Sequence, residues 1–270
     1  MAQEKSPDKP RIVQLFTSEN RVLAMLRVGD ATPFPVVFDT GTNGNLVDLL
    51  VAQRLNLTNT GPSKSIDGGT GKPVPGYNSF LKNARIGGVP IADDEVSVLA
   101  FDGTNEVGIV GPNSWPGELV EMDGPRSRLT ILPKTAATTP VGEGTPYLGD
   151  GGSALPSVVL RVEGQEIPAI LDSGNDATII LPMEYKDRLT LEAPPVAAGF
   201  ATSAAGRQPI LKARLAGNVR MGNVTIVRPT VTFKAVGRPN VGLPVLRRIK
   251  VVYDHSASRS WIVSPPTVVE

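Results

Sequence analysis

The sequence Val36-Val37-Phe38-Asp39-Thr40-Gly41-Thr42 is echoed in the second half of the chain by Ala169-Ile170-Leu171-Asp172-Ser173-Gly174-Asn175. Each stretch is an apolar run that leads into an aspartate, a small hydroxyl residue and a glycine. An aspartate at the end of an apolar strand is costly to desolvate, so its position calls for a reason. The glycine permits a tight turn, and the hydroxyl can hydrogen-bond to backbone and fix that turn. The alternative interpretation is a simple tight turn that happens to occur twice.

Further matching blocks flank both stretches at a nearly constant spacing, which favours an internal duplication over chance. Each aspartate is followed by a short helical pattern that ends in Arg-Leu-x-Leu, predicted over 47–57 and 182–191. The other matching blocks are 85–91 with 220–226, Val110-Gly111 with Val241-Gly242, and 123–131 with 254–262. The sequence therefore predicts two copies of one unit, with insertions in the loops.

The composition indicates a mainly β protein. The chain of 270 residues contains 28 Gly and 25 Pro, and these break short runs rich in Val, Ile, Leu and Thr. We predict a disordered segment over 1–10, a first lobe over 11–136, a linker over 137–152 and a second lobe over 153–270. Each lobe is expected to be a small, closed, barrel-like β unit. An approximate two-fold axis between the lobes would bring Asp39 and Asp172 face to face.

The absent residue types exclude several kinds of chemistry. The chain has no Cys and one His, so a thiolate zinc site, a cysteine nucleophile and a two-histidine metal motif are excluded. His255 lies in a turn-like run and is interpreted as a surface residue rather than a member of a catalytic triad. The net charge of +1 and the lack of a long apolar run predict neither a nucleic-acid partner nor stable membrane insertion. We expect no metal and no cofactor, which leaves hydrolytic chemistry to carboxylates.

Two carboxylates held close together cannot both ionise cheaply, so they share a proton and titrate as a pair. One member is then a base and the other an acid at the same pH. A water molecule between them can lose a proton as it attacks a carbonyl group, while the protonated acid supports the developing oxyanion. Such a pair hydrolyses peptides without a metal ion, a thiol or a histidine.

Phe38-Asp39-Thr40-Gly41-Thr42 and Leu171-Asp172-Ser173-Gly174-Asn175 resemble the signatures of aspartic proteases. With its short lobes, the chain looks most like the tandem, single-chain retropepsin-like enzymes of bacteria, and the resemblance covers nearly the whole chain. It implies the two-lobed acid-protease fold, with Asp39 and Asp172 as the catalytic pair. It also implies loop support from Thr40, Gly41, Thr42, Ser173, Gly174 and Asn175, with Thr40 and Ser173 interlocking the two loops and Thr42 and Asn175 near the outer carboxylate oxygens. A substrate-binding flap would contain Asp67, Gly68, Gly69, Thr70 and Gly71, and Ser203 and Ala204 would take the equivalent place in the second lobe.

Three positions depart from the family pattern. Gly68 stands where pepsin-type flaps carry a tyrosine, and Asn175 replaces the usual Ala, Ser or Thr. Asn240 interrupts the apolar pair before Gly242, whereas Ile109-Val110-Gly111 keeps that pattern in the first lobe. None of these changes removes a catalytic carboxylate. An amide at Asn175 could still donate a hydrogen bond to the acid and alter the pKa of the pair.

The expected function is that of an aspartic endopeptidase acting on an extended peptide or protein substrate. Because both acids lie in one chain, we expect a monomer. The alternative is a catalytically silent module of the same fold that binds peptides or another partner. The polar start Ala2-Gln3 resembles the N-terminus that remains after a signal peptide is cleaved, which favours export, for example to the periplasm. The alternative is the start of a cytoplasmic protein.

Overall fold

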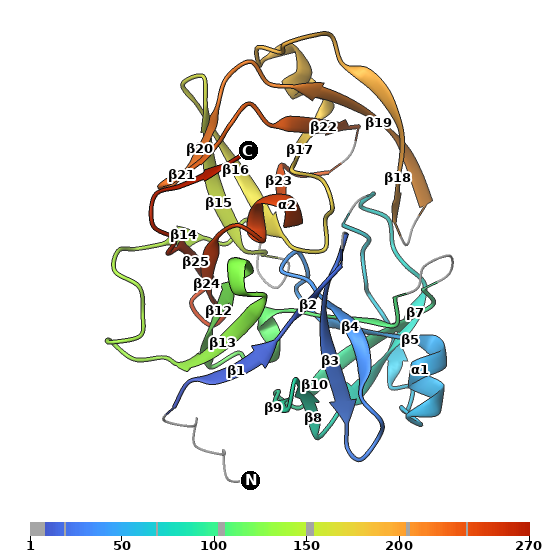
Figure 1. Cartoon of the computed structure of the whole chain (residues 1–270). Helices are drawn as coiled ribbons and strands as arrows, with labels where there is room; N and C mark the ends of the chain where they lie inside the picture. The colour runs from blue at the N-terminus through green and yellow to red at the C-terminus, as the bar shows by residue number, and fades with distance from the viewer. Residues whose placement is uncertain are drawn as a thin grey trace.

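The computed structural model describes residues 9–18, 20–68, 70–101, 106–149, 154–203, 206–235 and 237–270. Over these residues the chain is mainly β, with two large sheets and a smaller third sheet. Figure 1 shows the first half of the chain, in blue to green, below the second half, in yellow to red. The predicted mainly β, two-lobed fold class is confirmed. No helix in the described ranges is long and apolar enough to span a membrane.

The first large sheet lies in the N-terminal half and carries Asp39 at the end of one of its central strands. In spatial order its strands are β6 (Gly61–Pro62), β7 (Gly76–Leu81), β10 (Asp94–Leu99), β5 (Asn45–Asp48), β11 (Gly108–Val110), β4 (Phe34–Phe38), β3 (Val22–Val28), β8 (Ala84–Ile86) and β9 (Val89–Pro90), and β2 (Phe16–Thr17) pairs with β3.

The second large sheet repeats this order in the C-terminal half. Its strands are β18 (Val196–Ser203), β19 (Gly206–Arg214), β22 (Thr230–Lys234), β17 (Ile179–Pro182), β23 (Asn240–Gly242), β16 (Gln165–Asp172), β15 (Ser157–Val162), β20 (Val219–Met221), β21 (Val224–Ile226) and β26 (Thr267–Val269). Strand β4, which leads into Asp39, pairs in parallel with β11, and Gly111 follows β11 directly. Strand β16, which ends in Asp172, pairs in parallel with β23, which includes Gly242. The two large sheets therefore share one strand order, and the internal duplication stays a prediction.

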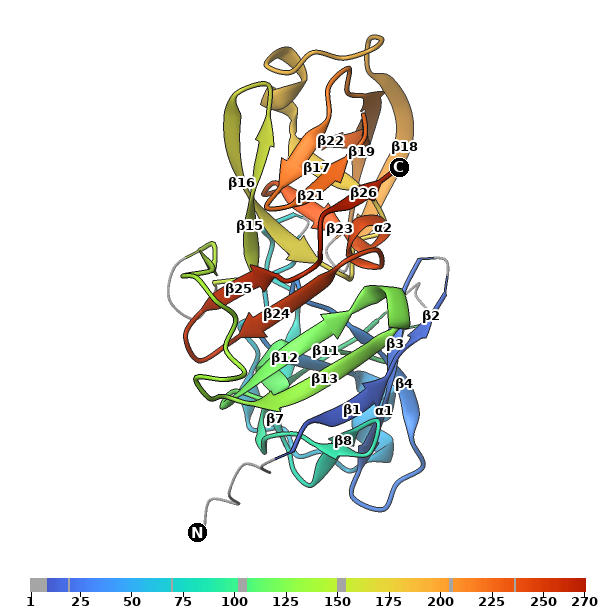
Figure 2. The same cartoon turned by 60° about the vertical axis from the view of Figure 1, so that its left-hand side comes forward.

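A six-stranded sheet joins the two halves. Its order is β1 (Arg11–Gln14), β13 (Arg128–Pro133), β12 (Glu118–Asp123), β24 (Lys250–Asp254), β25 (Arg259–Ile262) and β14 (Thr145–Pro146). Figure 2 shows the green strands β12 and β13 beside the red strands β24 and β25, between the two large sheets. Strands β12 and β24 pair directly, with Asp123 opposite Lys250. Contiguous backbone pairing therefore connects halves that are far apart in sequence.

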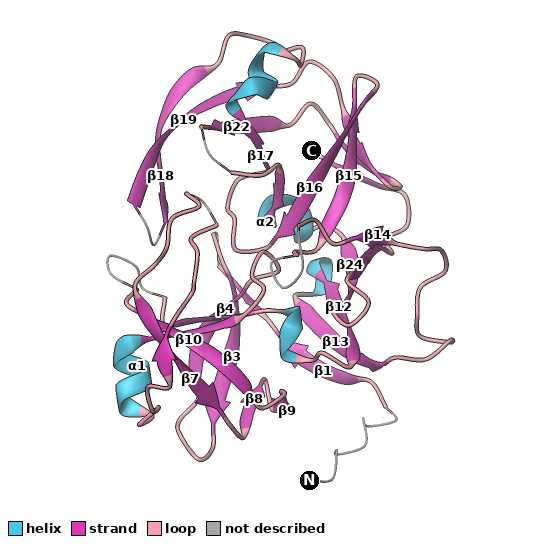
Figure 3. Cartoon of the chain, turned by 180° about the vertical axis from the view of Figure 1, so that it is seen from behind, coloured by secondary structure: helices cyan, strands magenta, loops and turns pink. Residues whose placement is uncertain are grey.

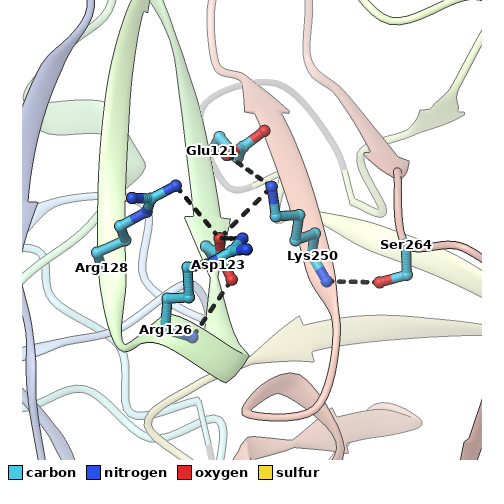
Figure 4. Close-up of polar contacts among 6 residues, drawn as sticks. All are labelled: Glu121, Asp123, Arg126, Arg128, Lys250 and Ser264. Carbon is cyan, nitrogen blue, oxygen red and sulfur yellow. Dashed lines mark hydrogen bonds and ion pairs between the residues drawn. The ribbon is translucent and has the colours of Figure 1, made fainter.

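Asp123 is the centre of an ion-pair cluster in this joining sheet (Figure 4). The buried carboxylate accepts from Arg126 at 3.0 Å, and Arg128 and Lys250 lie at 3.6 and 3.4 Å. Lys250 also lies 3.4 Å from Glu121. Burial alone would raise the pKa of Asp123, but the Arg126 hydrogen bond and the Lys250 charge outweigh burial and lower it.

The strands that carry the acids are buried on both faces where they approach the site. Val36, Val37 and Phe38 at the end of β4 are all buried, as are Ala169, Ile170 and Leu171 before Asp172 in β16. Each strand has neighbours on both sides, so a continuous apolar run fits it better than an alternating one. The earlier part of β3 keeps the alternation of a strand with one buried face. This packing fixes the position of each strand end.

The helices are shorter than predicted, as the cyan segments of Figure 3 show. The expected helix over 47–57 begins with the last residues of β5 and becomes α1 (Leu49–Arg54), capped by the Asp48 carboxylate. The expected helix over 182–191 is only the 3₁₀ helix η4 (Met183–Asp187), and its first residue, Pro182, is instead the last residue of strand β17 (Ile179–Pro182). The other helical segments are α2 (Leu243–Leu246), η1 (Pro112–Ser114) and η2 (Gly124–Arg126).

Each large sheet has two free ends in its strand order, so closure of the predicted barrel-like units is not observed over the described residues. The predicted linker contributes β14 to the joining sheet and a bridge between Leu148 and Leu155. The lobe boundaries themselves remain predictions. Most of the segment predicted to be disordered, 1–10, lies outside the described residues.

Candidate active site

Asp39 and Asp172 lie at the ends of the central strands of the two large sheets. The backbone N–H of Asp39 donates to the carbonyl oxygen of Val110 at 2.8 Å, which continues the parallel pairing of β4 and β11. Asp172 is paired in register with Gly242 of β23. Both aspartates are partly buried and keep some exposed surface. The surrounding sheets therefore hold both acids in place.

The residues after the two acids bind each other's loops. The Thr40 hydroxyl donates to the Leu171 carbonyl at 2.8 Å and accepts the Ser173 N–H at 3.0 Å. In return, the Ser173 hydroxyl donates to the Phe38 carbonyl at 2.7 Å and accepts the Thr40 N–H at 3.0 Å. Both side chains are fully buried. These four hydrogen bonds fix one acid loop relative to the other.

The two glycines bring the backbone of each loop against the acid of the other. A Cβ atom added to Gly41 would lie 2.5 Å from Cγ of Asp172, and one added to Gly174 would lie 2.7 Å from Cγ of Asp39. The N–H of Gly41 also donates to Oδ1 of Asp39 at 2.6 Å, and that of Gly174 donates to Oδ1 of Asp172 at 3.0 Å. Only glycine allows this approach. The structure thus brings the two predicted acids together.

The proximity of the acids has an electrostatic consequence. Burial, followed by the negative charge of Asp172, raises the pKa of Asp39 well above its ordinary value of 3.8, although the N–H groups of Gly41 and Gly174 oppose the shift. A hydrogen bond between the two carboxyl groups acts in the same direction as burial. This arrangement favours one shared proton, held by Asp39, over two charged carboxylates.

A glycine supports each acid loop from behind. A Cβ atom on Gly111 would lie 2.9 Å from the carbonyl oxygen of Asp39 and 2.7 Å from Oδ1 of Asn113. At Gly242 it would meet the Asn175 side-chain amide nitrogen at 2.7 Å. The Leu243 N–H then donates to the Asn175 carbonyl at 2.8 Å. Both glycines therefore pack closely against the acid loops.

The outer positions of the two loops differ from expectation. The Thr42 hydroxyl donates to the carbonyl of Gly44 at 2.8 Å and so closes its own turn. Asn175 donates to the side-chain oxygen of Asn240 at 2.8 Å rather than serving Asp172 directly. Asn240 is the residue whose amide nitrogen donates to Oδ2 of Asp172. In the sequence, Asn240 interrupts an apolar pair. Its spacing from Gly242 is the pattern that could have indicated that Asn240 lies beside the second acid loop.

The predicted flap of the first half forms a tight hairpin. Ile66 and Pro73 make an antiparallel bridge, and the Gly71 N–H donates to the Asp67 carbonyl at 2.8 Å. The buried Asp67 carboxylate accepts both the N–H and the hydroxyl of Thr70 at 2.7 Å, so it shapes the turn instead of facing outward. Gly68 has open space around its α-carbon. Gly69 lies outside the described residues.

The second half presents a longer hairpin in the equivalent place. Strands β18 and β19 pair up to Ser203 and Gly206, and Ala204 lies outside the described residues. Figures 1 and 3 show this hairpin extending toward the first half of the chain. The pairing of β18 with β19 shifts in register between Ala197 and Phe200.

The single histidine lies in the turn after β24 and is half-buried, with its ring 6.2 Å from that of Tyr147. This position is less exposed than a typical surface residue, and burial lowers the pKa of His255. The described residues contain no cluster of His, Asp and Glu suited to a metal ion.

Comparison with known proteins points to the same chemistry. Residues 24–113 match a family model described as aspartyl protease. This range includes Asp39 and its loop and ends just beyond Gly111. No curated protein matches the sequence. The family match confirms the resemblance to aspartic proteases over these residues, and it supports a general aspartic protease function.

Proposed function

From the aspartyl protease match over residues 24–113 and the site geometry, we propose that this chain is an aspartic endopeptidase with Asp39 and Asp172 as its catalytic residues. The observation that carries the proposal is the contact between the two carboxyl groups at the ends of β4 and β16. One of them has a raised pKa because it is buried beside the other. Such a pair supplies an acid and a base at one pH.

The proposed reaction starts with Asp39 protonated and Asp172 ionised. Asp172 removes a proton from a water molecule as the water oxygen attacks the scissile carbonyl carbon. The Asp39 proton supports the oxygen on which negative charge develops. The tetrahedral intermediate then collapses: the C–N bond breaks and the nitrogen takes up a proton from the pair. The products are a carboxylic acid and an amine, and the pair returns to its state with one proton.

The interlock and the glycines support this proposal because they restrict the relative motion of the acids. Each loop is tied to the other through buried hydrogen bonds of Thr40 and Ser173. Displacement of a reacting group by about 1 Å can cost on the order of a hundredfold in rate, so this rigidity is valuable to a catalyst. The substrate would be an extended peptide held by backbone hydrogen bonds, between the hairpin closed by the Ile66–Pro73 bridge and the β18–β19 hairpin.

We also propose that the protein is a monomer, and that the loop and flap residues predicted from the sequence belong to this site. Both acids come from one chain, so a monomer would be active. Specific activity that is constant on dilution over a hundredfold range is expected, and a fall with dilution would contradict the monomer.

The proposal is tested by turnover with an unfolded protein and a peptide library from about pH 3 to 8. Cleavage that disappears in Asp39→Asn supports it. The alternative, a silent binding module, predicts no turnover at any pH but binding of an extended peptide or of an inhibitor that mimics the tetrahedral intermediate. Absence of both turnover and inhibitor binding in the folded protein would contradict the proposal.

A further inference from the structure

The two acids of the site have different side-chain neighbours, although their backbone surroundings match. Asp172 receives a hydrogen bond from the side chain of Asn240 at Oδ2 and one from the Gly174 N–H at Oδ1. Asp39 receives backbone N–H groups and shares a hydrogen bond with Asp172. The residue of the first sheet in the register position of Asn240 is Ile109, whose apolar side chain has no donor to offer. The different side chains at these two equivalent positions therefore make the surroundings of Asp39 and Asp172 unequal.

The orientation of the Asn240 amide follows from a chain of contacts that begins at the backbone. The Ala177 N–H donates to Oδ1 of Asn175 at 2.9 Å, which directs the NH₂ group of Asn175 away from that side. This NH₂ group donates to Oδ1 of Asn240 at 2.8 Å. The Asn240 oxygen is then occupied as an acceptor, so its NH₂ group faces Asp172. An amide NH₂ group only donates, which makes the contacted carboxyl oxygen an acceptor.

We propose that Asn240 is a positioning residue that holds Asp172 as the ionised member of the pair, so that the shared proton is carried by Asp39. A hydrogen bond to the charged form of an acid favours that form. Asp172 then has an N–H donor on each oxygen, as an ionised carboxylate prefers. The inference rests on the proposed function for its catalytic meaning, since it assigns the base to Asp172 and the acid to Asp39.

The other charged or titratable groups that act on Asp172 come from three elements. Lys234 at the end of β22 is a cation in the acid range and favours the ionised form of Asp172. Tyr253 of β24 is fully buried, and burial raises its pKa, so it stays neutral. Asp39 itself opposes ionisation of Asp172 through its charge. Lys234 acts in the same direction as Asn240, so a test must separate the amide from the lysine.

The test is carbon-13 NMR of protein labelled at the aspartate carboxyl carbons, titrated from about pH 2 to 8. Asp39→Asn and Asp172→Asn assign the two signals. In the wild type, the Asp39 carboxyl is expected to stay protonated to higher pH than an ordinary aspartate, because it is buried beside Asp172 and its pKa is raised. In Asn240→Leu, which keeps a similar size but has no donor, the ionisation of the Asp172 carboxyl should move up by about one pH unit. Asn240→Ala serves if the leucine variant does not fold.

An exchange variant provides the converse experiment. Ile109→Asn combined with Asn240→Ile places the amide in the first sheet, and the preference for Asp172 as the ionised member should then weaken. Lys234→Met controls for the lysine: substitution of Asn240 should produce its shift in that background as well. Titrations that are unchanged in both Asn240→Leu and Asn240→Ala would overturn the inference, as would a shift seen only when Lys234 is present.

Activity measurements distinguish this inference from the proposed function. If the enzyme cleaves peptides, the acid limb of kcat/KM should move up by about one pH unit in Asn240→Leu, whereas a purely structural defect lowers activity at all pH values without moving the limb. If the wild type cleaves nothing, the proposed function fails, and the NMR titration still decides whether Asn240 sets the protonation of the pair.

Discussion

Thr40 and Ser173 exchange their hydrogen bonds across the two halves of the chain: each hydroxyl accepts the other residue's N–H and donates to the carbonyl just before the other acid. The contacts join residues that are 131 to 135 positions apart in sequence. Both side chains have 0% of their surface exposed. A change in one loop is therefore felt at the acid of the other.

Loss of the Thr40 hydroxyl should destabilise the protein. Thr40→Val leaves the Ser173 N–H and the Leu171 carbonyl buried without this partner, at a cost of about 1–3 kcal/mol for each group. A double-mutant cycle with Ser173→Ala, measured by denaturant unfolding, should show that the two losses are not additive. Thr60→Val is the matched control, because its hydroxyl donates to Asn78 at an exposed position. Equal effects at Thr40 and Thr60 would contradict the interlock.

A methyl group on Gly41 should damage catalysis more than folding. In Gly41→Ala the new Cβ would overlap the Asp172 carboxyl group, so the pair would be forced apart. We expect kcat/KM to fall by at least about a hundredfold. Gly44→Ala, three residues along the same loop, has open space and should retain normal kcat/KM. Equal values of kcat/KM for Gly41→Ala and Gly44→Ala would contradict the close approach of the loop to Asp172.

The sequence predicted the elements that depend on local pattern. Apolar runs buried on both faces marked the strands before Asp39 and Asp172, and Thr40 and Ser173 were expected to interlock through the family resemblance. The sequence predicts that helices begin at 47 and at 182. In the structure 47–48 and 182 are instead the ends of strands β5 and β17, and short apolar segments fit either structure. Tertiary neighbours, rather than propensity, decided the strand assignment at these positions.

Long-range pairing and side-chain orientation could not be predicted in the same way. The repeat matched Asp123 with Asp254, but it did not indicate that β12 and β24 pair with each other and form a sheet between the halves. Asn175 was expected at the acid, since it follows the glycine directly. The structure assigns that contact to Asn240, which is 68 positions from Asp172 and reaches it only because β23 pairs with β16.

The raised pKa of Asp39 predicts that its carboxyl group costs stability at neutral pH. Above its folded pKa, wild-type Asp39 carries a charge that the fold disfavours, whereas below about pH 3.9 it is protonated in both the folded and unfolded states. Asp39→Asn should therefore raise Tm at pH 7–8, and the gain should vanish near pH 3. Each tenfold difference in acid constant corresponds to about 1.4 kcal/mol.

Thermal unfolding at several pH values measures this effect. Asp30→Asn, at an exposed turn, is the control and should change Tm little at any pH. An Asp39→Asn variant less stable than the wild type at neutral pH would contradict the electrostatic description of the pair.

Asp123 should behave in the opposite way. Its pKa is lowered in the fold, so its contribution is present above the unfolded value of about 3.9 and is lost as the pH falls through the folded pKa. Asp123→Asn removes the centre of the cluster in Figure 4 and should cost about 1.5–3 kcal/mol at pH 7, with a smaller difference below pH 4.

Denaturant unfolding at pH 7 and pH 3 tests this prediction. The control is Glu166→Gln, which removes an exposed ion pair with Arg161 and should have an effect near zero. A loss of stability in Asp123→Asn that is independent of pH would show that packing, rather than charge, is what the cluster contributes.

The most direct test of the central claim is the cleavage rate of an unfolded protein substrate by the wild type, Asp39→Asn and Asp172→Asn, with all three confirmed as folded. Two carboxylates that share one proton predict cleavage by the wild type in the acid-to-neutral range. Both single variants should lose it by at least about four orders of magnitude, since neither acid can work without the other. A variant that cleaves at the wild-type rate would contradict the claim.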